Sequence, residues 1–422
     1  MIHCSVRPRV TAVSALVLAA TVVAMAAAEE RPAPVRVDSV GALAEALRDA
    51  KPGTVIELAP GTYRRGLHAA EVRGAPDRPV VVRSADGDRP AVFDGANVHV
   101  SEPAYLVLEN LVIRNAPHNG LNVDDGGSRE TPAHHLVLRD LVVEGTGPDG
   151  NKDGLKLSGV DDLLVDRCTI RGWGGGGGSG IDMVGCHRVL IHDCRFQGRT
   201  GSASQGIQAK GGSSEVVVRG CRLVDAGDRA VQFGGSTGIP YFRPPGARYE
   251  NRRCVALGNV VLGASAAVGF VGTEDSAFLY NTVVRPRRYV LRILQEQRAD
   301  GYLRCRKNTF AHNLVVWREG DLRAHVNIGP DTHPETFTFV ENLWYQTDSP
   351  AGASRPRLPA AETGGVYGKD PGLADLANPG PPDEAYAAFG HTAKGEAEAW
   401  RTLARPMVKW AAGQVREGGA GK

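Results

Sequence analysis

The chain has 422 residues, of which 53 are glycine, 42% are hydrophobic and 6% are aromatic, and its formal net charge is +2. This hydrophobic share with so little net charge excludes a disordered chain. Glycines without a period of three exclude a collagen-like one. No basic excess is available to neutralise a phosphate backbone, so we expect no nucleic-acid partner.

The first 28 residues have the order of a cleavable secretory signal. Arg7 and Arg9, which account for the whole net charge, precede an apolar run over 10–28, and small residues stand just before Glu29. The alternative is an uncleaved anchor, but a spanning helix needs about 20 apolar residues. We expect a signal peptide over 1–28, a linker over 29–36, a secreted or periplasmic location, and no membrane contact after cleavage.

The next segment predicts a short amphipathic helix. Ser39 can cap a helix that runs to about Ala50 and places Leu43 and Leu47 on one face. Residues 51–63 then predict a first strand and turn.

A four-residue segment recurs eight times and predicts a set of equivalent strands. Its first and third positions are always apolar, which is the period-2 pattern of a strand with one buried face. The segments are 121–124, 155–158, 181–184, 207–210, 231–234, 268–271, 291–294 and 326–329.

A second set of recurring positions is in phase with the first. Each ends a strand and is followed by an apolar pair or near-pair. These positions are Asn110, Asp140, Cys168, Cys194, Cys221, Asn259, Asn281, Asn313 and Asn342.

Two strands in every repeat, with no helical pattern between them, predict one parallel coil per repeat. Equivalent residues of stacked coils then lie about 4.8 Å apart and form ladders. Residues 37–345 resemble the right-handed parallel β-helix of the pectin-lyase-like superfamily. We therefore expect an all-β solenoid of about ten coils, monomeric, with the N-terminal helix capping its first coil.

The repeat stops after Trp344. Residues 349–382 are rich in proline and glycine, and residues 383–412 have a helical pattern. We expect 346–422 to be a loop and helical extension that packs on the β-helix.

Six cysteines remain after the signal. Cys168, Cys194 and Cys221 follow the coil repeat, which favours free thiols stacked as small buried hydrophobes. A Cys254–Cys305 disulfide is the alternative for that pair. The chain has no CxxC pair, which argues against a zinc site.

Outward residues of the repeated strand form a polar strip. Its central column is Asn122, Lys156, Asp182, Gln208, Gln232, Gly269, Arg292 and Asn327. Longer loops at 125–153, 235–267 and 295–325 would wall this strip into a groove for an extended polymer. We assign substrate binding to Lys156, Gln208, Gln232, Arg229, Arg243 and Asp153.

Three residues of this strip are candidates for catalysis. Lys210, followed by two glycines, suits a general base if nearby arginines lower its pKa. Asp182 suits proton handling, and the alternative is an exposed ion pair with Lys156. Arg292 suits a carboxylate clamp, and the alternative is an ion pair with Glu296.

A metal site has weaker support. His118, His134 and His135 stand near Asp124 and Asp125 in the sequence without a recognisable ligand spacing. A divalent cation such as calcium is conceivable there, and the cofactor is left open.

Residues 210–235 resemble the chondroitinase B and alginate lyase family. The resemblance implies that Lys210 is the base, that an arginine on the next rung is the acid, and that calcium neutralises a uronate carboxylate. Gln232-Phe233-Gly234 stands where the arginine is expected, and Ser202–Gln205 carries no acid. Of the residues that the resemblance implies, only the lysine base therefore has a counterpart here, Lys210.

Residues 151–154 resemble a polygalacturonase motif instead. They read Asn-Lys-Asp-Gly where the family has Asn-Thr-Asp-Gly. Inverting hydrolysis needs two opposed carboxyl groups about 6.5–9.5 Å apart, and Asp153 with Asp182 are the candidates.

The sequence therefore predicts a secreted, carbohydrate-active protein that binds a polysaccharide. Our leading hypothesis is a lyase that cleaves an acidic, uronate-containing polysaccharide by β-elimination. The alternatives are a glycoside hydrolase that uses Asp153 and Asp182, and a glycan-binding surface protein without catalysis.

Overall fold

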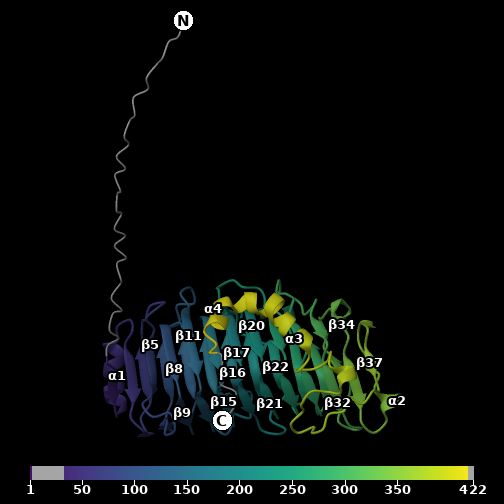
Figure 1. Ribbon diagram of the computed structural model, residues 1–422, viewed down its shortest axis with the longest axis horizontal. Coiled ribbons are helices and arrows are strands. Elements are labelled where there is room, and N and C mark those ends of the chain that lie inside the picture. Colours follow the sequence, from purple (N-terminus) through teal and green to yellow (C-terminus); the bar gives the residue numbers. More distant parts are fainter. Residues whose placement is uncertain (2–32, 417–422) are drawn as a thin grey trace. The chain divides into compact units, whose positions relative to one another are not determined.

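The computed structural model of the protein describes Met1 and residues 33–416. The expected signal peptide over 1–28 lies outside the described residues, as does Cys4. Within residues 33–416, the coils stack on one another, and their parallel strands form three long sheets (Figure 1). We refer to them as sheets A, B and C.

Sheet A and sheet B contain most of the strands. Sheet A runs through β1 (Val35–Val37), β2 (Val55–Leu58), β5 (Val80–Ser84), β8 (Ala104–Glu109), β11 (Ala133–Arg139), β14 (Val160–Asp166), β17 (His187–His192), β20 (Ser213–Arg219), β24 (Val255–Leu257), β28 (Ala277–Leu279), β31 (Thr309–Ala311), β34 (Thr338–Val340) and β36 (Glu362–Thr363), with β23 (Asn251–Arg252) and β27 (Thr273–Glu274) beside this path. Sheet B runs through β3 (Gly61–Tyr63), β6 (Ala91–Asp94), β9 (Leu111–Arg114), β12 (Val142–Glu144), β15 (Thr169–Arg171), β18 (Arg195–Gln197), β21 (Arg222–Val224), β25 (Val260–Leu262), β29 (Thr282–Val284), β32 (Leu314–Trp317), β35 (Leu343–Gln346) and β37 (Val366–Tyr367).

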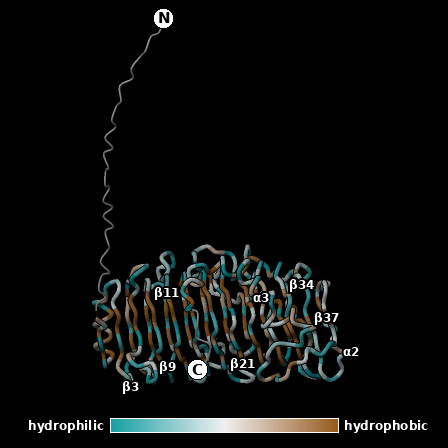
Figure 2. The backbone as a smooth tube through the Cα atoms, viewed as in Figure 1, coloured by the Kyte–Doolittle hydropathy of each residue, from teal (hydrophilic) through white to brown (hydrophobic). Residues whose placement is uncertain are grey.

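Sheet C contains all eight recurring segments identified in the sequence. Its ten strands are β4 (Leu67–Ala70), β7 (Val98–Ser101), β10 (Leu121–Asp124), β13 (Leu155–Ser158), β16 (Ser179–Val184), β19 (Gln205–Lys210), β22 (Arg229–Gly234), β26 (Ala266–Val271), β30 (Tyr289–Leu294) and β33 (Val326–Ile328). The predicted parallel solenoid is confirmed, and β4 and β7 extend it toward the N-terminus. Figure 2 shows the expected alternation of hydrophobic and hydrophilic residues along the stacked strands.

The sequence analysis expected two strands in each coil, but the structure has three. Sheets A and B are joined by a single residue in the left-handed region, such as Asn110 (φ 53°) or Asp140 (φ 52°). A connection of this kind leaves no clear turn signal in the sequence. The sequence analysis therefore treated the sheet A strand and the sheet B strand of each coil as one. Since Arg139 pairs with Asp166, Asp140 stacks on Arg167, and our alignment of Asp140 with Cys168 was wrong by one residue.

Inside the coil, the predicted cysteine and asparagine ladders are confirmed. Cys168, Cys194 and Cys221 are buried and free, as are Cys186, Cys254 and Cys305, so no Cys254–Cys305 disulfide forms. The column continues through Asn259, Asn281, Asn313 and Asn342, where each amide oxygen accepts hydrogen bonds from the preceding rung. The ladder thereby satisfies polar groups that would otherwise be buried without partners.

Helices lie at both ends and along one side of the stack (Figure 1). Ser39 caps α1 (Val40–Arg48), and Leu43 and Leu47 are buried against the first coils, as predicted. The other helices are η1 (Ile239–Tyr241), η2 (Pro334–Thr336), α2 (Pro350–Ala353), η3 (Glu384–Tyr386), α3 (Lys394–Ala399), η4 (Trp400–Ala404), η5 (Arg405–Val408) and α4 (Lys409–Gly413). Among the described residues, no helix is both long and apolar enough to cross a membrane.

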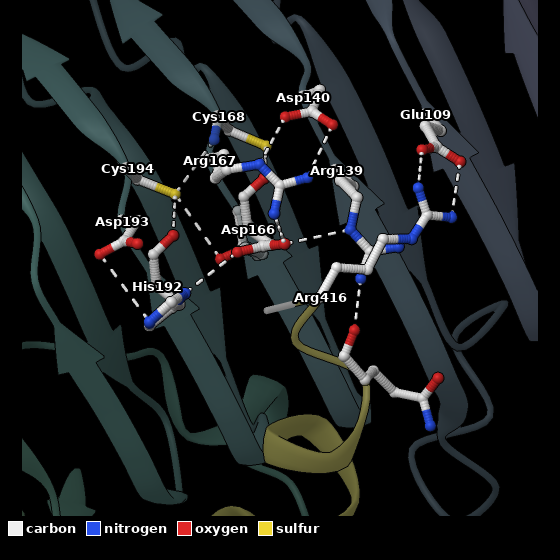
Figure 3. A network of polar contacts seen from close by, with 12 residues as sticks. Glu109, Arg139, Asp140, Asp166, Arg167, Cys168, His192, Asp193, Cys194 and Arg416 are labelled. Carbon is white, nitrogen blue, oxygen red and sulfur yellow. Dashed lines mark hydrogen bonds and ion pairs between the residues drawn. The ribbon is translucent and has the colours of Figure 1, made fainter. Parts of the chain in front are cut away.

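The C-terminal helices cover an outward apolar column of sheet A. Val408 and Ala411 pack against Leu164, Leu190 and Val217, and the helices cross these strands in Figure 1. Ion pairs hold the end of this segment in place. Figure 3 shows Arg416 reaching Glu109, and Arg139 donating to the carbonyl of Gln414.

Candidate active site

The outward face of sheet C brings most of the predicted site residues into one column. The strand register pairs Lys156 with Asp182, Asp182 with Gln208, and Gln208 with Gln232. Arg292 follows two strands later, beyond Gly269. The alternation correctly places these residues on the side of the strands that faces away from the core, although Asp182, Gln208 and Gln232 are themselves buried.

Asp182 is the centre of the column and carries two lysine partners. Lys156 Nζ donates to Asp182 Oδ2, and Lys210 Nζ lies 3.3 Å from Asp182 Oδ1. Lys156 Nζ is also 3.8 Å from Asp153 Oδ2, so the two lysines and two carboxyl groups form one cluster. The exposed fraction is 2% for the Asp182 side chain, against 24% for Lys156 and 19% for Lys210.

This burial pattern changes the expected nature of the ion pair. The sequence alternative was an exposed pair, but the carboxylate lies beneath its lysines, which are the groups that reach solvent. A ligand on sheet C therefore meets ammonium groups first, and the buried carboxyl groups act on it through them.

The environment pushes the pKa values of the two carboxyl groups in opposite directions. Burial, reinforced by the neighbouring charge of Asp182, raises the pKa of Asp153 to about 7. Burial also opposes ionisation of Asp182, but Lys210 and Lys156 outweigh it and lower the pKa of Asp182. Lys156 is buried too, yet Asp182 and Asp153 raise its pKa. Such divergence between two neighbouring carboxyl groups is typical of groups that exchange protons.

The two glutamines extend the cluster toward the C-terminal coils. Gln208 Oε1 accepts a hydrogen bond from Lys210 Nζ at 3.1 Å. Gly235 lies directly above, where a Cβ atom would stand 2.9 Å from Gln208 Nε2 and 3.2 Å from Lys210 Cδ. A side chain at position 235 would displace the ends of Gln208 and Lys210, so this glycine leaves room for both beside the 235–250 loop.

Arg229 and Arg292 line a pocket beyond the glutamines. The pocket measures about 520 Å³ and also contains Asp228, Arg288 and Glu296. Arg229 pairs with Glu296 at 3.0 Å, whereas Arg292 donates to Asp228 at 2.6 Å and to Asn327 at 2.9 Å. The expected alternative of an Arg292–Glu296 pair was wrong, because Asp228 reaches Arg292 from two coils away.

Asp228 and Arg288 are site residues that sequence reasoning missed. They stand just before β22 and β30, outside the four-residue window that defined the repeat. The sequence analysis could have found them from their positions directly before Arg229 and Tyr289, which are both paired in the strand register.

Arg243 does not join this column. Its guanidinium forms a bidentate ion pair with Asp125 and is largely buried over Gly159 and Gly185. It fastens the 235–250 loop to the edge of the stack, so its predicted contact with substrate is not supported by its position.

The residues considered for a metal site do not converge. Asp124 accepts hydrogen bonds from Ser101 and contacts His99, Asp125 pairs with Arg243, and His134 contacts His135 on sheet A. Residues 33–416 contain no group of three His, Cys, Asp or Glu side chains arranged to hold a metal ion. The segment matching the calcium carboxylates of the resembling family carries the linked hydroxyls of Ser202 and Ser204 and the buried Gln205 Oε1 but no carboxylate, so it does not fit the calcium site that the resemblance implies.

Comparison with known proteins supports the fold. Residues 96–284 match the family model described as a right handed beta helix region. The chain is a right-handed parallel β-helix. This agrees with the resemblance seen in the sequence.

Three bacterial proteins are among the solved structures whose backbone resembles that of this chain. An alginate lyase from Paenibacillus sp. str. FPU-7 is 19% identical, with a TM-score of 0.47, over 72% of this chain and 98% of that one. A family 6 polysaccharide lyase from Pseudopedobacter saltans is 12% identical (TM-score 0.48; 85% and 99% covered). A lacto-N-biosidase from Eubacterium ramulus is 12% identical (TM-score 0.47; 78% and 64% covered). No curated protein matches the sequence.

Proposed function

We propose that this β-helix binds an acidic polysaccharide along the outward face of sheet C and cleaves it by β-elimination. The observation that carries the proposal is the cluster of Lys156 and Lys210 around buried Asp182, beside a carboxyl group with a pKa of about 7. Two ammonium groups on one strip attract a uronate carboxylate, and the buried carboxyl groups supply sites for proton transfer.

The reaction divides between the two lysines. Lys156, whose pKa is raised, remains charged and neutralises the uronate carboxylate, which makes the adjacent C5 proton more acidic. Lys210 removes that proton, the C4–C5 double bond forms, and the C4–O4 bond breaks as the same proton passes from Lys210 to O4. This assignment makes Lys210 the base and Arg229, Gln208 and Gln232 the groups that position the sugar.

Lys210 can act as a base only after it passes its own proton on. The cluster provides a path: Lys210 passes a proton to Asp182, Asp182 passes one to Lys156, and Lys156 gives one of its own to Asp153, 3.8 Å away, and so stays charged. Asp153, with a pKa near 7, can accept a proton at neutral pH. The charged form of Asp153 is therefore the active one.

The decisive experiment is a screen of soluble uronate polysaccharides with two readouts. Elimination creates an unsaturated uronate that absorbs in the ultraviolet, together with one new reducing end for each cleavage. New reducing ends without that absorbance would overturn elimination and favour hydrolysis. Binding without either product would indicate a glycan-binding protein.

Hydrolysis is the second candidate because of one observation. The pKa values of Asp153 and Asp182 diverge as they do in the acid and base of glycosidases. Both carboxyl groups lie beneath the lysines, with exposed fractions of 3% and 2%, which favours the lysine mechanism.

We further propose that the protein acts as a secreted or periplasmic monomer. The support is the signal-like order of residues 1–28. N-terminal sequencing of protein exported with its own leader should begin at Glu29, and a retained leader would contradict this.

A further inference from the structure

A second cationic pocket lies at the C-terminal end of sheet C. It measures about 700 Å³, and its lining contains Arg318, Arg323, Arg355 and Arg357, with Glu319 as the acidic side chain among them. Leu322, Val326, Ile328 and Leu358 contribute an apolar floor. Sheet C ends here at β33, whereas sheets A and B each continue by one more strand, so the 352–359 segment borders the pocket instead of a further strand.

The four arginines of this pocket reach solvent. All four are exposed, and within residues 33–416 none of them forms an ion pair; Arg355 lies over the ring of Tyr367. Two nearby carboxylates are already engaged, because Asp321 pairs with Arg285 and Asp348 accepts from the backbone of Glu319, so Glu319 is the acid that lines the pocket beside the four arginines. Arg229 and Arg292, by contrast, are each paired with an acid.

The charge of the surrounding coils adds to that of these arginines. Residues 222–323 contain sixteen lysines and arginines against nine aspartates and glutamates. Since the whole chain is nearly neutral, its positive charge is concentrated in these coils. Such a field draws a polyanion toward this end of the stack.

The pocket lies next to the pocket that contains Arg229 and Arg292, on the same sheet as the lysine cluster. Arg323 donates its backbone N–H to the carbonyl of Arg288 at 2.9 Å, and Arg288 lines the pocket of Arg229 and Arg292. Arg292 in turn donates to Asn327 on the terminal strand. From β16 to β33 the sheet advances five strands, which is about 24 Å at about 4.8 Å per strand.

We propose that this pocket is a distal subsite that binds the carboxylate or sulfate groups of an acidic polysaccharide lying along sheet C. The guanidinium groups are suited to bidentate contact with such anions. The apolar floor, with Ile328 exposed on the last strand, suits the C–H face of a sugar ring. The identity of the polymer rests on the proposed function. Only chains long enough to span both sites engage the pocket.

The test compares the Arg323→Ala/Arg357→Ala double variant with wild type. Calorimetric titration uses long polyuronate chains, short uronate oligosaccharides and a long sulfated glycan. We expect the double variant to bind long chains about tenfold or more weakly, because it loses two charged contacts. The kcat/KM for short oligosaccharides should not change. An Arg64→Ala/Arg65→Ala variant, altered at exposed arginines of the N-terminal coils, is the matched control and should behave as wild type.

The outcomes separate this inference from the proposed reaction. Equal binding of long chains by the double variant and wild type would overturn the subsite even if cleavage occurs. Loss of long-chain binding in the double variant would support it even if no glycan is cleaved. Stronger loss for the sulfated glycan would identify sulfate as the preferred anion, and stronger loss for polyuronate would identify carboxylate. If wild type binds neither polymer, the subsite is wrong.

Discussion

Asp182 illustrates how one buried residue sets the chemistry of its neighbours. Its carboxylate is almost inaccessible, yet it holds Lys156 and Lys210 on the face of sheet C. Its negative charge also raises the pKa of Asp153 and separates the two carboxyl groups functionally. Residue identity alone predicted which side chains face outward, but their protonation depends on these contacts.

Replacing Lys210 with alanine should remove the proposed base. We expect kcat to fall about a hundredfold or more, the usual contribution of general-base catalysis. The melting temperature should change little, because Lys156 still pairs with Asp182. Steady-state kinetics and thermal unfolding measure the two effects, with Lys307→Ala at an exposed site as the control. Full activity of Lys210→Ala would remove Lys210 from the mechanism and favour the Asp153–Asp182 pair.

Titration of Asp153 should make kcat/KM depend on pH near neutrality, with lower activity on the acidic side. Because its charged form is the active one, kcat/KM should rise as the pH increases through about 7. In the Asp153→Asn variant this pH dependence should disappear and activity should be low at every pH. An unchanged pH dependence in the variant would assign it to another group.

The same shift predicts a pH dependence of stability. A carboxyl group whose pKa is raised by folding binds its proton more tightly in the folded state, so it stabilises the fold most at low pH. That stabilisation is lost as the pH rises from about 4 to about 7. Between about pH 4 and about pH 7, the free energy of unfolding of wild type should fall on the order of a few kcal/mol relative to that of the Asp153→Asn variant. Denaturant unfolding at several pH values measures it, and parallel curves would contradict the prediction.

Among the structural elements, the stacked strands owe their register to buried ladders. In the ladder, Asn281 accepts from Asn259 and donates to Asn313 and to the carbonyls of Ala256 and Leu279. This dense use of one amide explains why a polar residue is tolerated in the core. It also fixes the stacking of adjacent coils, which an apolar residue would leave less specific.

Replacing Asn281 with alanine should destabilise the protein strongly. The change leaves several buried donors and acceptors without partners, each costing about 1–3 kcal/mol. We expect the free energy of unfolding to fall by at least about 2 kcal/mol, measured by denaturant titration. Asn151→Ala, in an exposed loop, provides the control. A loss as small as that of the control would mean that the ladder does not stabilise the stack.

The C-terminal helices should be needed to keep sheet A soluble. Val408 is 1% exposed and packs on the outward apolar column of that sheet. In the Val408→Asp variant, a buried unpaired charge should displace the segment. We expect increased binding of a hydrophobic dye and aggregation, while the coils keep their circular dichroism spectrum. Arg401→Asp, at an exposed position of the same segment, is the control.

At the scale of the whole molecule, different charged groups occupy different coils along the outward face of sheet C. The central coils carry the lysine–aspartate cluster, and the later coils carry arginines that end in the distal pocket. A nearly neutral chain thereby presents a strongly cationic end. The composition argued against a nucleic-acid partner because it shows no basic excess, but residues 222–323 carry a positive net charge that the composition of the whole chain conceals.

The sequence by itself determined the β-helix, the inward ladders and the outward column of Lys156, Asp182, Gln208 and Gln232. It did so because a solenoid repeats the same burial at fixed positions, so period 2 within strands and the coil repeat between them can be read directly. It could not resolve sheet B, since a single left-handed residue separates its strands from those of sheet A.

The tertiary structure alone decided which charges meet. Arg243 pairs with Asp125 across 118 residues, and Arg292 pairs with Asp228 across 64. Side chains that long can reach several partners, and no period relates the residues that they choose. The same holds for the C-terminal helices, whose apolar face fits the outer side of sheet A only after the coils have stacked. Burial of Asp153 beside Asp182, and with it a pKa of about 7, also exists only in the folded chain.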